Sequence, residues 1–347
     1  MLAARFYGAG DIRIEEIKKP RISKDEILVK VKSAALCGTD LRMYRHGLAN
    51  NASLPITLGH EFSGVIAAVG AEVSHYTEGM EVVVAPNMGC GVCRQCVQGN
   101  THHCPDYKAL GIHLDGGFAE YVRIPKEAVV QGNVTPIPAG LSFEEAALVE
   151  PLSSVYSGLE RCQVGLGDYV LIIGGGPIGI MHAKLALLAG AAKVLLNDRN
   201  QSRRDLAVQV DSRIIPLQSD DLVEQVQNAT KGEGLDVCII AAPSPEAQSL
   251  SLQLMAQNGR VNFFGGLPKE AEIVPLNSNL IHYKQLLVTG TTRASLGQFR
   301  KCLDLVAAEL VDLQGLITGR YSLSEFAVAL ATAGSSQGYK SMVNFVD

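Results

Sequence analysis

The sequence has no long hydrophobic run, no cationic block and no internal repeat. No uninterrupted apolar stretch approaches the ~18 residues that a membrane-spanning helix needs. The N-terminal stretch meets charge at Arg5 and Asp11, so we expect no secretory signal. The net charge of −5 argues against a nucleic-acid or anionic-membrane partner. The expected protein is therefore a cytoplasmic enzyme or binding protein for small molecules.

The length of 347 residues predicts two domains rather than one simple core. The first 150 residues carry short β-type segments, such as residues 26–36 and 61–70, punctuated by glycine and proline. From about residue 169, strand-like runs alternate with helical patterns, one of which covers residues 245–259. This alternation is typical of a parallel sheet covered by helices, and residues 285–290 add a further strand.

The first strand–helix pair of this region contains a dinucleotide-binding pattern. Residues 169–190, YVLIIGGGPIGIMHAKLALLAG, hold G-x-G-x-x-G as Gly174, Gly176 and Gly179. The first glycine allows a tight turn, the second allows close approach of a pyrophosphate, and the third allows helix and strand to pack. Pro177 and Ile178 open the helix, whose N-terminus would bind the pyrophosphate. The pattern predicts a nicotinamide dinucleotide cofactor, against the alternative of a tight turn without a ligand.

The next strand ends in an acidic residue that bears on the choice of cofactor. Asp198 lies 24 residues after Gly174, near the ~20 expected for the acid that binds the ribose 2′-OH. A carboxylate repels a 2′-phosphate, so Asp198 favours NAD over NADP. Arg199, Arg203 and Arg204 follow closely and keep NADP open, because an arginine can accommodate that phosphate.

Four of the eight cysteines lie together in residues 90–104, CGVCRQCVQGNTHHC. In a reducing compartment, clustered cysteines are more often metal ligands than disulfides. Four thiolates predict a tetrahedral, closed zinc site, and the last gap of seven residues fits less well with an iron–sulfur cluster. The four predicted ligands are Cys90, Cys93, Cys96 and Cys104.

A second set of candidate ligands is scattered along the first half of the chain. Cys37 opens CGTD, His60 and Glu61 stand in GHEFSG, and Glu150 stands in LVEPLSS. A thiolate, an imidazole and carboxylates form a plausible set for zinc with an open position. Nothing local shows that these residues meet, and singly each also fits a structural or solvated side chain.

Together these motifs resemble the zinc-dependent medium-chain alcohol dehydrogenases, and most of all their sorbitol, or polyol, dehydrogenase branch. The resemblance runs nearly end to end, with the motifs in the family's order and spacing. The matching stretches are CGTD at 37–40, GHEFSGVIAAVG at 59–70, the four-cysteine cluster at 90–104, DGGFAEY at 115–121, EPLS at 150–153 and GGGPIG at 174–179.

The resemblance implies an α/β protein of two domains. One is a GroES-like, β-rich catalytic domain, residues 1–153 and 291–347, with a structural zinc lobe at about 88–106. The other is a Rossmann NAD-binding domain, a doubly wound parallel sheet at residues 154–290. The active site is expected in the cleft between them.

The resemblance also implies two zinc ions per chain, one structural and one catalytic. Cys37, His60 and a carboxylate would hold the catalytic zinc. Glu150 occupies the position where other members carry a second cysteine, and it points to the polyol branch, either as a ligand or through water. Glu61 follows the zinc histidine and is either a ligand or a close neighbour.

The implied reaction is hydride transfer from a secondary carbinol to the nicotinamide, with zinc lowering the pKa of the hydroxyl. Thr39 matches the family's relay hydroxyl. A histidine often stands three residues further on, but Arg42 stands there in this sequence and cannot shuttle a proton. The relay would continue through His46, through water or to the cofactor ribose.

Phe118 and Arg293 resemble positions that line the polyol pocket. Arg293 can donate hydrogen bonds to neighbouring hydroxyls or bind a phosphate, so a polyol, a cyclic polyol or a sugar-alcohol phosphate fits. The alternatives are a threonine-type or simple secondary-alcohol dehydrogenase, and a non-enzymatic relative that would lack the catalytic zinc ligands. By analogy with the family, we expect a homotetramer, with a homodimer as the alternative.

Overall fold

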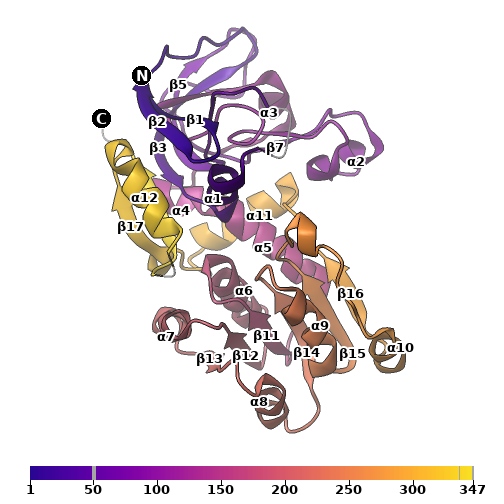
Figure 1. Cartoon of the computed structure of the whole chain (residues 1–347). Helices are drawn as coiled ribbons and strands as arrows, with labels where there is room; N and C mark the ends of the chain where they lie inside the picture. The colour runs from indigo at the N-terminus through magenta and orange to yellow at the C-terminus, as the bar shows by residue number, and fades with distance from the viewer. Residues whose placement is uncertain (49–51, 336, 346–347) are drawn as a thin grey trace. The chain divides into compact units, whose positions relative to one another are not determined.

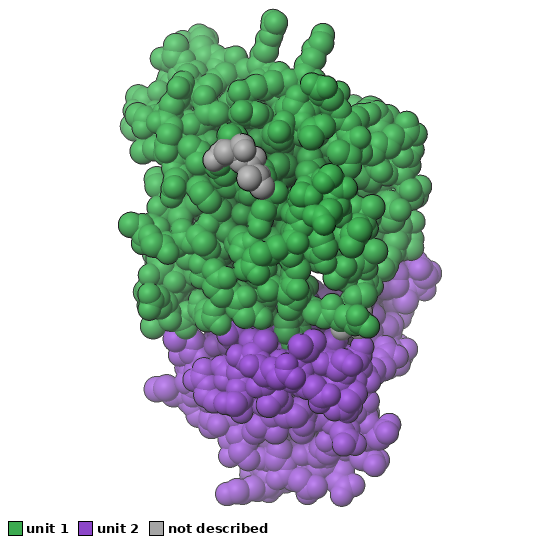
Figure 2. All heavy atoms as spheres, turned by 90° about the vertical axis from the view of Figure 1, so that its left-hand side faces the viewer, with its two compact units in different colours: residues 1–153, 294–347 green, residues 154–293 purple. Residues whose placement is uncertain are grey.

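The chain folds into two compact units, coloured separately in Figure 2. The computed structural model describes residues 1–48, 52–335 and 337–345. Unit 1 comprises Met1–Ser153 and Ala294–Asp347, and unit 2 comprises Ser154–Arg293. Within the described ranges, no helix is both long and apolar enough to cross a membrane.

Unit 1 is built on a seven-stranded sheet with the order β10-β6-β5-β3-β18-β17, in which β9 also pairs with β3. A three-stranded sheet, β2-β1-β4, and a short β7-β8 pair complete its strands. The strands are β1 (Leu2–Gly8), β2 (Asp11–Glu16), β3 (Ile27–Ala35), β4 (Ile56–Thr57), β5 (Glu61–Val69), β6 (Glu81–Val84), β7 (Asn87–Met88), β8 (Lys108–Ala109), β9 (Tyr121–Ile124), β10 (Val134–Pro136), β17 (Ile317–Tyr321) and β18 (Lys340–Asn344).

Short helices connect and cover these strands. They are α1 (Gly38–His46), α2 (Arg94–Val97), α3 (Lys126–Gln131), α4 (Phe143–Ala147), α11 (Leu296–Ala307) and α12 (Phe326–Ala333), with single 3-10 turns at Thr101–His103, Gln314–Leu316 and Leu323–Glu325. Helix α5 (Val149–Cys162) begins in unit 1 and continues past Ser153 into the residues of unit 2. Fully buried aromatic rings, including Phe6, Phe62, Phe118 and Phe326, fill the core of unit 1. Burial of such large apolar side chains is the main stabilising contribution.

The end of the chain returns to a strand laid down near its beginning. β18 pairs antiparallel with β3, placing Met342 opposite Ala35. β5 pairs with the other edge of β3, placing Glu61 opposite Ala35. Figure 1 shows the yellow C-terminal segment beside the indigo N-terminal strands. The sheet of unit 1 is therefore complete only when segments about 300 residues apart have met.

Unit 2 is a parallel sheet with helices between successive strands. All five strand pairings are parallel, and the order is β13-β12-β11-β14-β15-β16. This is the doubly wound order 3-2-1-4-5-6 of dinucleotide-binding folds, so the predicted Rossmann sheet is confirmed. Its elements are β11 (Tyr169–Ile173), α6 (Pro177–Leu188), β12 (Lys193–Asn197), α7 (Gln201–Val210), β13 (Ile214–Leu217), α8 (Leu222–Ala229), β14 (Leu235–Ile240), α9 (Pro245–Leu254), β15 (Met255–Phe263), the 3-10 turn Lys269–Ala271, α10 (Ser278–Lys284) and β16 (Leu287–Gly290).

The helix expected over residues 245–259 is too long. α9 ends at Leu254, and β15 begins at Met255. Asn258 adopts a left-handed φ of 60°, which a helix does not tolerate, and a Cβ on Gly259 would lie 2.8 Å from Met255 Cε. The apolar pattern therefore continued past the point at which the backbone leaves the helix.

One histidine in unit 2 is buried without polar partners. His182, on α6, has no exposed surface, and within the described residues neither of its ring nitrogens has a hydrogen-bond partner. Its ring packs edge-on against Phe264, with 4.7 Å between the ring centroids. Burial lowers the pKa of His182 to about 3, so the folded protein holds this ring neutral.

This predicts acid sensitivity of unit 2. The unfolded chain protonates His182 below about pH 6.5, whereas the folded chain does not, so the free energy of unfolding falls as the pH drops from about 6.5 toward 3. Between about pH 7 and about pH 5, the free energy of unfolding of His182→Leu should fall by roughly 2 kcal/mol less than that of the wild type, as measured by urea unfolding. The exposed His282 supplies the control: His282→Leu should leave the loss unchanged. Equal losses in wild type and His182→Leu would contradict the prediction.

Candidate functional site

Three scattered residues of the sequence meet in unit 1. The candidate ligand atoms of Cys37, His60 and Glu61 lie within 4.8 Å of one another. Cys37 caps the N-terminus of α1, while His60 and Glu61 lie at the start of β5. His60 and Glu61 are buried, and Cys37 is partly exposed. A sulfur, an imidazole nitrogen and a carboxylate oxygen form a donor set that suits zinc.

Asp40 supports two of these ligands from behind. It is 1% exposed, and its Oδ2 accepts a hydrogen bond of 2.9 Å from the backbone N–H of Cys37. Its Oδ1 lies 3.6 Å from His60 Nδ1, which leaves Nε2 of that ring as the candidate ligand atom. A carboxylate behind a ligating imidazole orients the ring and raises its basicity.

Glu61 forms a buried ion pair with Lys340, on β18. Lys340 Nζ donates to Glu61 Oε1 at 2.7 Å and Oε2 at 2.6 Å, and also to the carbonyl of Leu36 at 3.3 Å. Burial lowers the pKa of Lys340, but the charges of Glu61 and Cys37 more than offset this, and the pKa lies above its usual value. The ammonium therefore stays charged within the site.

Glu150 lies in the first turn of α5 and belongs to the same electrostatic cluster. It is 9% exposed, and burial raises the pKa of its carboxyl to about 7. The charges of His60 and Lys340 act in the opposite direction, and that of Glu61 raises the pKa further. Among the described residues of this cluster, acidic groups thus outnumber the ammonium of Lys340. A divalent cation would bring the site close to neutrality and compete with the proton on Glu150, so the residues fit zinc.

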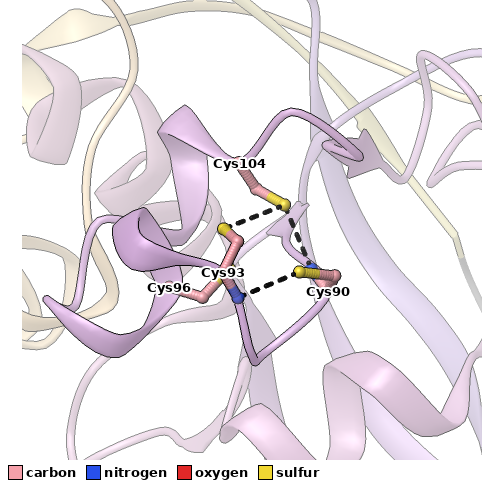
Figure 3. A group of neighbouring side chains, drawn as sticks. All are labelled: Cys90, Cys93, Cys96 and Cys104. Atoms are coloured by element: carbon pink, nitrogen blue, oxygen red, sulfur yellow. Dashed lines mark hydrogen bonds between the residues drawn. The ribbon is translucent and has the colours of Figure 1, made fainter.

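The four clustered cysteines form a second, separate group (Figure 3). The sulfur atoms of Cys90, Cys93, Cys96 and Cys104 lie within 4.8 Å of one another. Cys93 Sγ and Cys104 Sγ are 3.8 Å apart, close to the roughly 3.8 Å between corners of a tetrahedron with ~2.3 Å Zn–S bonds. Backbone N–H groups of Cys90 and Cys93 point at Cys104 Sγ and Cys90 Sγ. This group fits a closed tetrahedral metal site.

The lobe that carries these cysteines has almost no apolar core of its own. Val92 and Val97 are 82% and 74% exposed. Gly89 approaches the cluster closely, since a Cβ there would lie 2.5 Å from Cys96 Sγ. Backbone N–H groups of Val92 and Cys93 lower the pKa of the Cys90 thiol to about 7, which favours a thiolate. Metal–sulfur bonds would supply the cohesion that apolar packing does not.

The glycine-rich turn of unit 2 has the geometry that phosphate binding requires. Gly174 has a φ of +116°. A Cβ on Gly179 would fall 1.8 Å from the carbonyl oxygen of Gly174, so this position accepts only glycine. A Cβ built on Gly176 would have a single neighbouring heavy atom within 4 Å among the described residues, Arg203 Nη1 at 3.9 Å. The turn therefore leaves open space at the N-terminus of α6, which fits a pyrophosphate.

Asp198 follows β12 beside this turn. Its Oδ2 accepts a hydrogen bond of 2.7 Å from the backbone N–H of Gly175. Its Oδ1 accepts one of 2.8 Å from the backbone N–H of Asn200. Arg203 Nη1 lies 3.6 Å from Asp198 Oδ2. Arg204 points inward and donates to the Asp198 carbonyl and to Gln201, so it is not available to a cofactor phosphate. Arg199 is exposed.

The two predicted substrate residues have different positions. Phe118 is 0% exposed and packs against Phe326 in the core of unit 1, with 4.9 Å between ring centroids. Its ring is a core side chain of unit 1, and the contact of Phe118 with substrate stays a prediction. Arg293 is exposed at the end of unit 2 and has a left-handed φ of 59°.

The predicted relay residues lie along α1. Thr39 is partly exposed in its first turn, next to Cys37, while Arg42 and His46 are exposed further along. Sequence reasoning missed Asp40 and Lys340. Asp40 could have been found, since it stands three residues after Cys37, at capping-box spacing. Lys340 carried no signal, because its partner is 279 residues away.

Comparison with known proteins identifies the family. The alcohol dehydrogenase GroES-like domain matches residues 23–138, and the zinc-binding dehydrogenase domain matches residues 177–308. The chain belongs to the zinc-dependent medium-chain alcohol dehydrogenases. This confirms the resemblance read from the motifs, together with the expected combination of a GroES-like and a Rossmann domain.

Relatives of known name differ in substrate. A sorbitol dehydrogenase of Bacillus subtilis (strain 168) is 33% identical over 337 residues, covering 96% of this chain and 93% of the relative. An L-threonine 3-dehydrogenase of Bacillus licheniformis is 34% identical over 317 residues, covering 90% and 89%. A solved zinc-binding dehydrogenase of Sinorhizobium meliloti 1021, bound to NADP, superposes with a TM-score of 0.91 at 32% identity and 99% coverage of both chains.

The buried ion pair makes a prediction about stability. Lys340→Met leaves the Glu61 carboxylate buried without its cation, and the free energy of unfolding should fall by about 3–5 kcal/mol in denaturant titrations. The loss should be larger with a metal chelator present, because zinc would otherwise supply positive charge. The double variant Glu61→Gln/Lys340→Met removes both charges and should recover much of the loss. Equal losses in the single and double variants would show that packing, rather than charge, explains the effect.

Proposed function

We propose that the chain is a zinc-dependent, NAD-linked dehydrogenase that oxidises a secondary alcohol of a polyol, cyclic polyol or sugar alcohol to the ketone. The observation that carries this proposal is the donor set of Cys37, His60 and Glu61, together with the buried Glu150, whose carboxyl is coupled electrostatically to His60 and Glu61. A polar substrate fits such surroundings better than a small apolar alcohol, because the charges find partners among its hydroxyls.

Each residue of the set has a proposed role. Cys37, His60 and Glu61 would hold the metal, and Glu150 would lie next to it, as a ligand or through water. Bound zinc supplies a Lewis acid that lowers the pKa of an alcohol hydroxyl. Thr39 Oγ1 would accept the hydroxyl proton and pass it outward. Arg42 cannot carry that proton onward, so water or His46 would do so.

For the cofactor we propose NAD, which supplies the hydride acceptor. Asp198, held by two backbone N–H groups, places a carboxylate where the adenosine ribose is expected. Because Arg204 is turned inward, Arg199 and Arg203 are the arginines left to compensate a 2′-phosphate. The glycines 174, 176 and 179, with Pro177 and Ile178 at the start of α6, would bind the pyrophosphate.

For the substrate we propose that Arg293 contacts hydroxyls, or a phosphate, remote from the reacting carbon. A planar guanidinium has five N–H donors and suits either group. The second candidate is oxidation of the threonine hydroxyl, which is supported by the relative named L-threonine 3-dehydrogenase. In that case the same arginine would meet the carboxylate of the amino acid.

We also propose a homotetramer, with a dimer as the alternative. β16 is an edge strand of the sheet in unit 2, and its Leu287 is 45% exposed. Ile273 and Tyr283, which lie shortly before it in the chain, are 90% and 73% exposed. An open strand edge with exposed apolar side chains favours pairing with another chain.

The proposed division between two zinc sites can be tested by metal analysis. The purified protein should hold about two zinc ions per chain. Cys37→Ser should lose about one zinc and nearly all turnover while unfolding at about the wild-type temperature. Cys93→Ser should lose the other zinc and lower the apparent Tm by at least about 5 °C. A Cys93→Ser protein with full zinc and stability but no turnover would overturn the division.

The substrate proposal can be tested with a panel. The protein is incubated with NAD or NADP and with sorbitol, xylitol, inositols, a sugar-alcohol phosphate, threonine or short secondary alcohols, and the absorbance of the reduced nicotinamide is followed. We expect turnover of at least one polyol with NAD, and kcat/KM lower by roughly tenfold or more with NADP, because Asp198 repels the 2′-phosphate. Turnover of threonine or an apolar alcohol alone would refute the polyol assignment.

A further inference from the structure

A buried amide links the last two strands of the sheet in unit 2. Asn262, the penultimate residue of β15, is 0% exposed. Its Nδ2 donates to Thr289 Oγ1 at 3.0 Å and to Thr291 Oγ1 at 2.9 Å. Thr289 Oγ1 in turn donates to the Val261 carbonyl at 3.0 Å. Because that hydroxyl uses its proton there, it must accept from Asn262, which fixes the orientation of the amide. We refer to Asn262, Thr289 and Thr291 as the Asn262 clamp.

The clamp acts where the backbone ladder weakens. β16 is an edge strand, and in the described part of the chain it pairs with β15 alone. The ladder ends with Phe263 opposite Gly290, and the next backbone bond, from Thr291 N–H to the Phe263 carbonyl, is long at 3.4 Å. The side-chain bond from Asn262 to Thr291 is shorter by half an ångström. The side-chain hydrogen bond is therefore the stronger of the two that hold Thr291, where the chain leaves the sheet.

Two residues beyond the clamp, the backbone is strained. Arg293 has a φ of +59°, which a long side chain rarely adopts. Such a conformation persists only where the surrounding structure determines it, and it is concentrated at functional sites. Thr292, which lies between, is exposed and has no hydrogen bond within the described residues. The clamp is thus the nearest fixed point on the N-terminal side of Arg293, while the buried Ala294 and the α11 cap at Ser295 hold the chain on the other side.

The position of the clamp in the sheet relates it to the cofactor. Parallel strands of a doubly wound sheet present their carboxyl ends to the dinucleotide. The glycine turn and Asp198 follow β11 and β12, while the clamp closes the ends of β15 and β16, on the other side of β11. The two halves of such a sheet bind the two halves of the dinucleotide. The clamp therefore belongs to the nicotinamide half, where substrate reacts.

We propose that Asn262 is a positioning residue for substrate recognition: through Thr291 it fixes the turn that presents Arg293. The inference rests on the proposed role of Arg293 with hydroxyls or a phosphate. The amide is suited to this task because it offers two N–H donors to two hydroxyls at once. An aspartate would lack these donors, and a leucine would leave both hydroxyls without this partner.

The test compares near-isosteric variants of neighbouring threonines. Thr291→Val removes the acceptor of the clamp, Thr291→Ser restores it, and Thr292→Val is the matched control. Turnover is measured with the best polyol of the panel and with 2-butanol, which has no second hydroxyl for Arg293. We expect Thr291→Val to lower kcat/KM for the polyol roughly five- to tenfold and to leave that for 2-butanol unchanged. Thr291→Ser and Thr292→Val should behave like the wild type.

Combining Thr291→Val with Arg293→Ala shows whether the effect of Thr291→Val on polyol turnover depends on Arg293. Arg293→Ala should lower polyol turnover by itself, and adding Thr291→Val should lower it no further. Additive losses, or equal losses on the polyol and on 2-butanol, would overturn the positioning role.

A readout that needs no substrate separates this inference from the proposed function. In the intact protein, amide hydrogen exchange of the segment 287–296 should be faster in Thr291→Val than in Thr291→Ser or Thr292→Val. If exchange is faster in Thr291→Val but the protein oxidises no polyol, the result would support the clamp and refute the polyol assignment. Unchanged exchange in Thr291→Val would refute the clamp, whatever the substrate.

Discussion

The buried ion pair between Glu61 and Lys340 is the constraint on which the rest of unit 1 depends. Glu61 lies opposite Ala35 on β3, and Ala35 lies opposite Met342 on β18. Lys340 stands two residues before Met342 and so projects to the same face of the sheet. Ala35, on the strand between those of Glu61 and Lys340, has a small side chain. A carboxylate and an ammonium so deeply buried are each costly alone, so the three strands must align for either to be tolerated.

This constraint also explains why the catalytic unit needs both ends of the chain. The first 153 residues supply the candidate metal ligands, but the cation that balances Glu61 comes from the last strand. An N-terminal fragment would leave Glu61 and Glu150 buried with no ammonium beside them. The nucleotide-binding unit lies between these segments in the sequence. It can be inserted there because its own sheet is complete and none of its strands pairs with those of unit 1 within the described chain.

Patterns that repeat over short distances could be predicted from the sequence. The glycine turn, the strand–helix alternation of unit 2 and the four-cysteine cluster depend on neighbours in the chain, and each was found where its pattern placed it. The short edge strand β13 carries little signal in the sequence, because Pro216 interrupts a four-residue run that is half exposed. The full burial of Phe118 could not be predicted, because a resemblance carries over the position of a residue but not its burial. Lys340 and Asn262 gave no local signal, since their roles arise only from strand pairing.

The two candidate metal groups differ in a way that follows from how each is assembled. The four cysteines span fifteen residues, so a short loop can bring them together with little help from the rest of the fold, and four thiolates leave no position for a reactant. Cys37 comes from the start of α1, and His60 and Glu61 come from the start of β5. They are held by Asp40 on α1 and by Lys340 on β18. A site that must stay open cannot be closed by its own ligands. It needs the surrounding fold to hold them apart, and this explains why the reactive residues are scattered in the sequence while the structural ones are clustered.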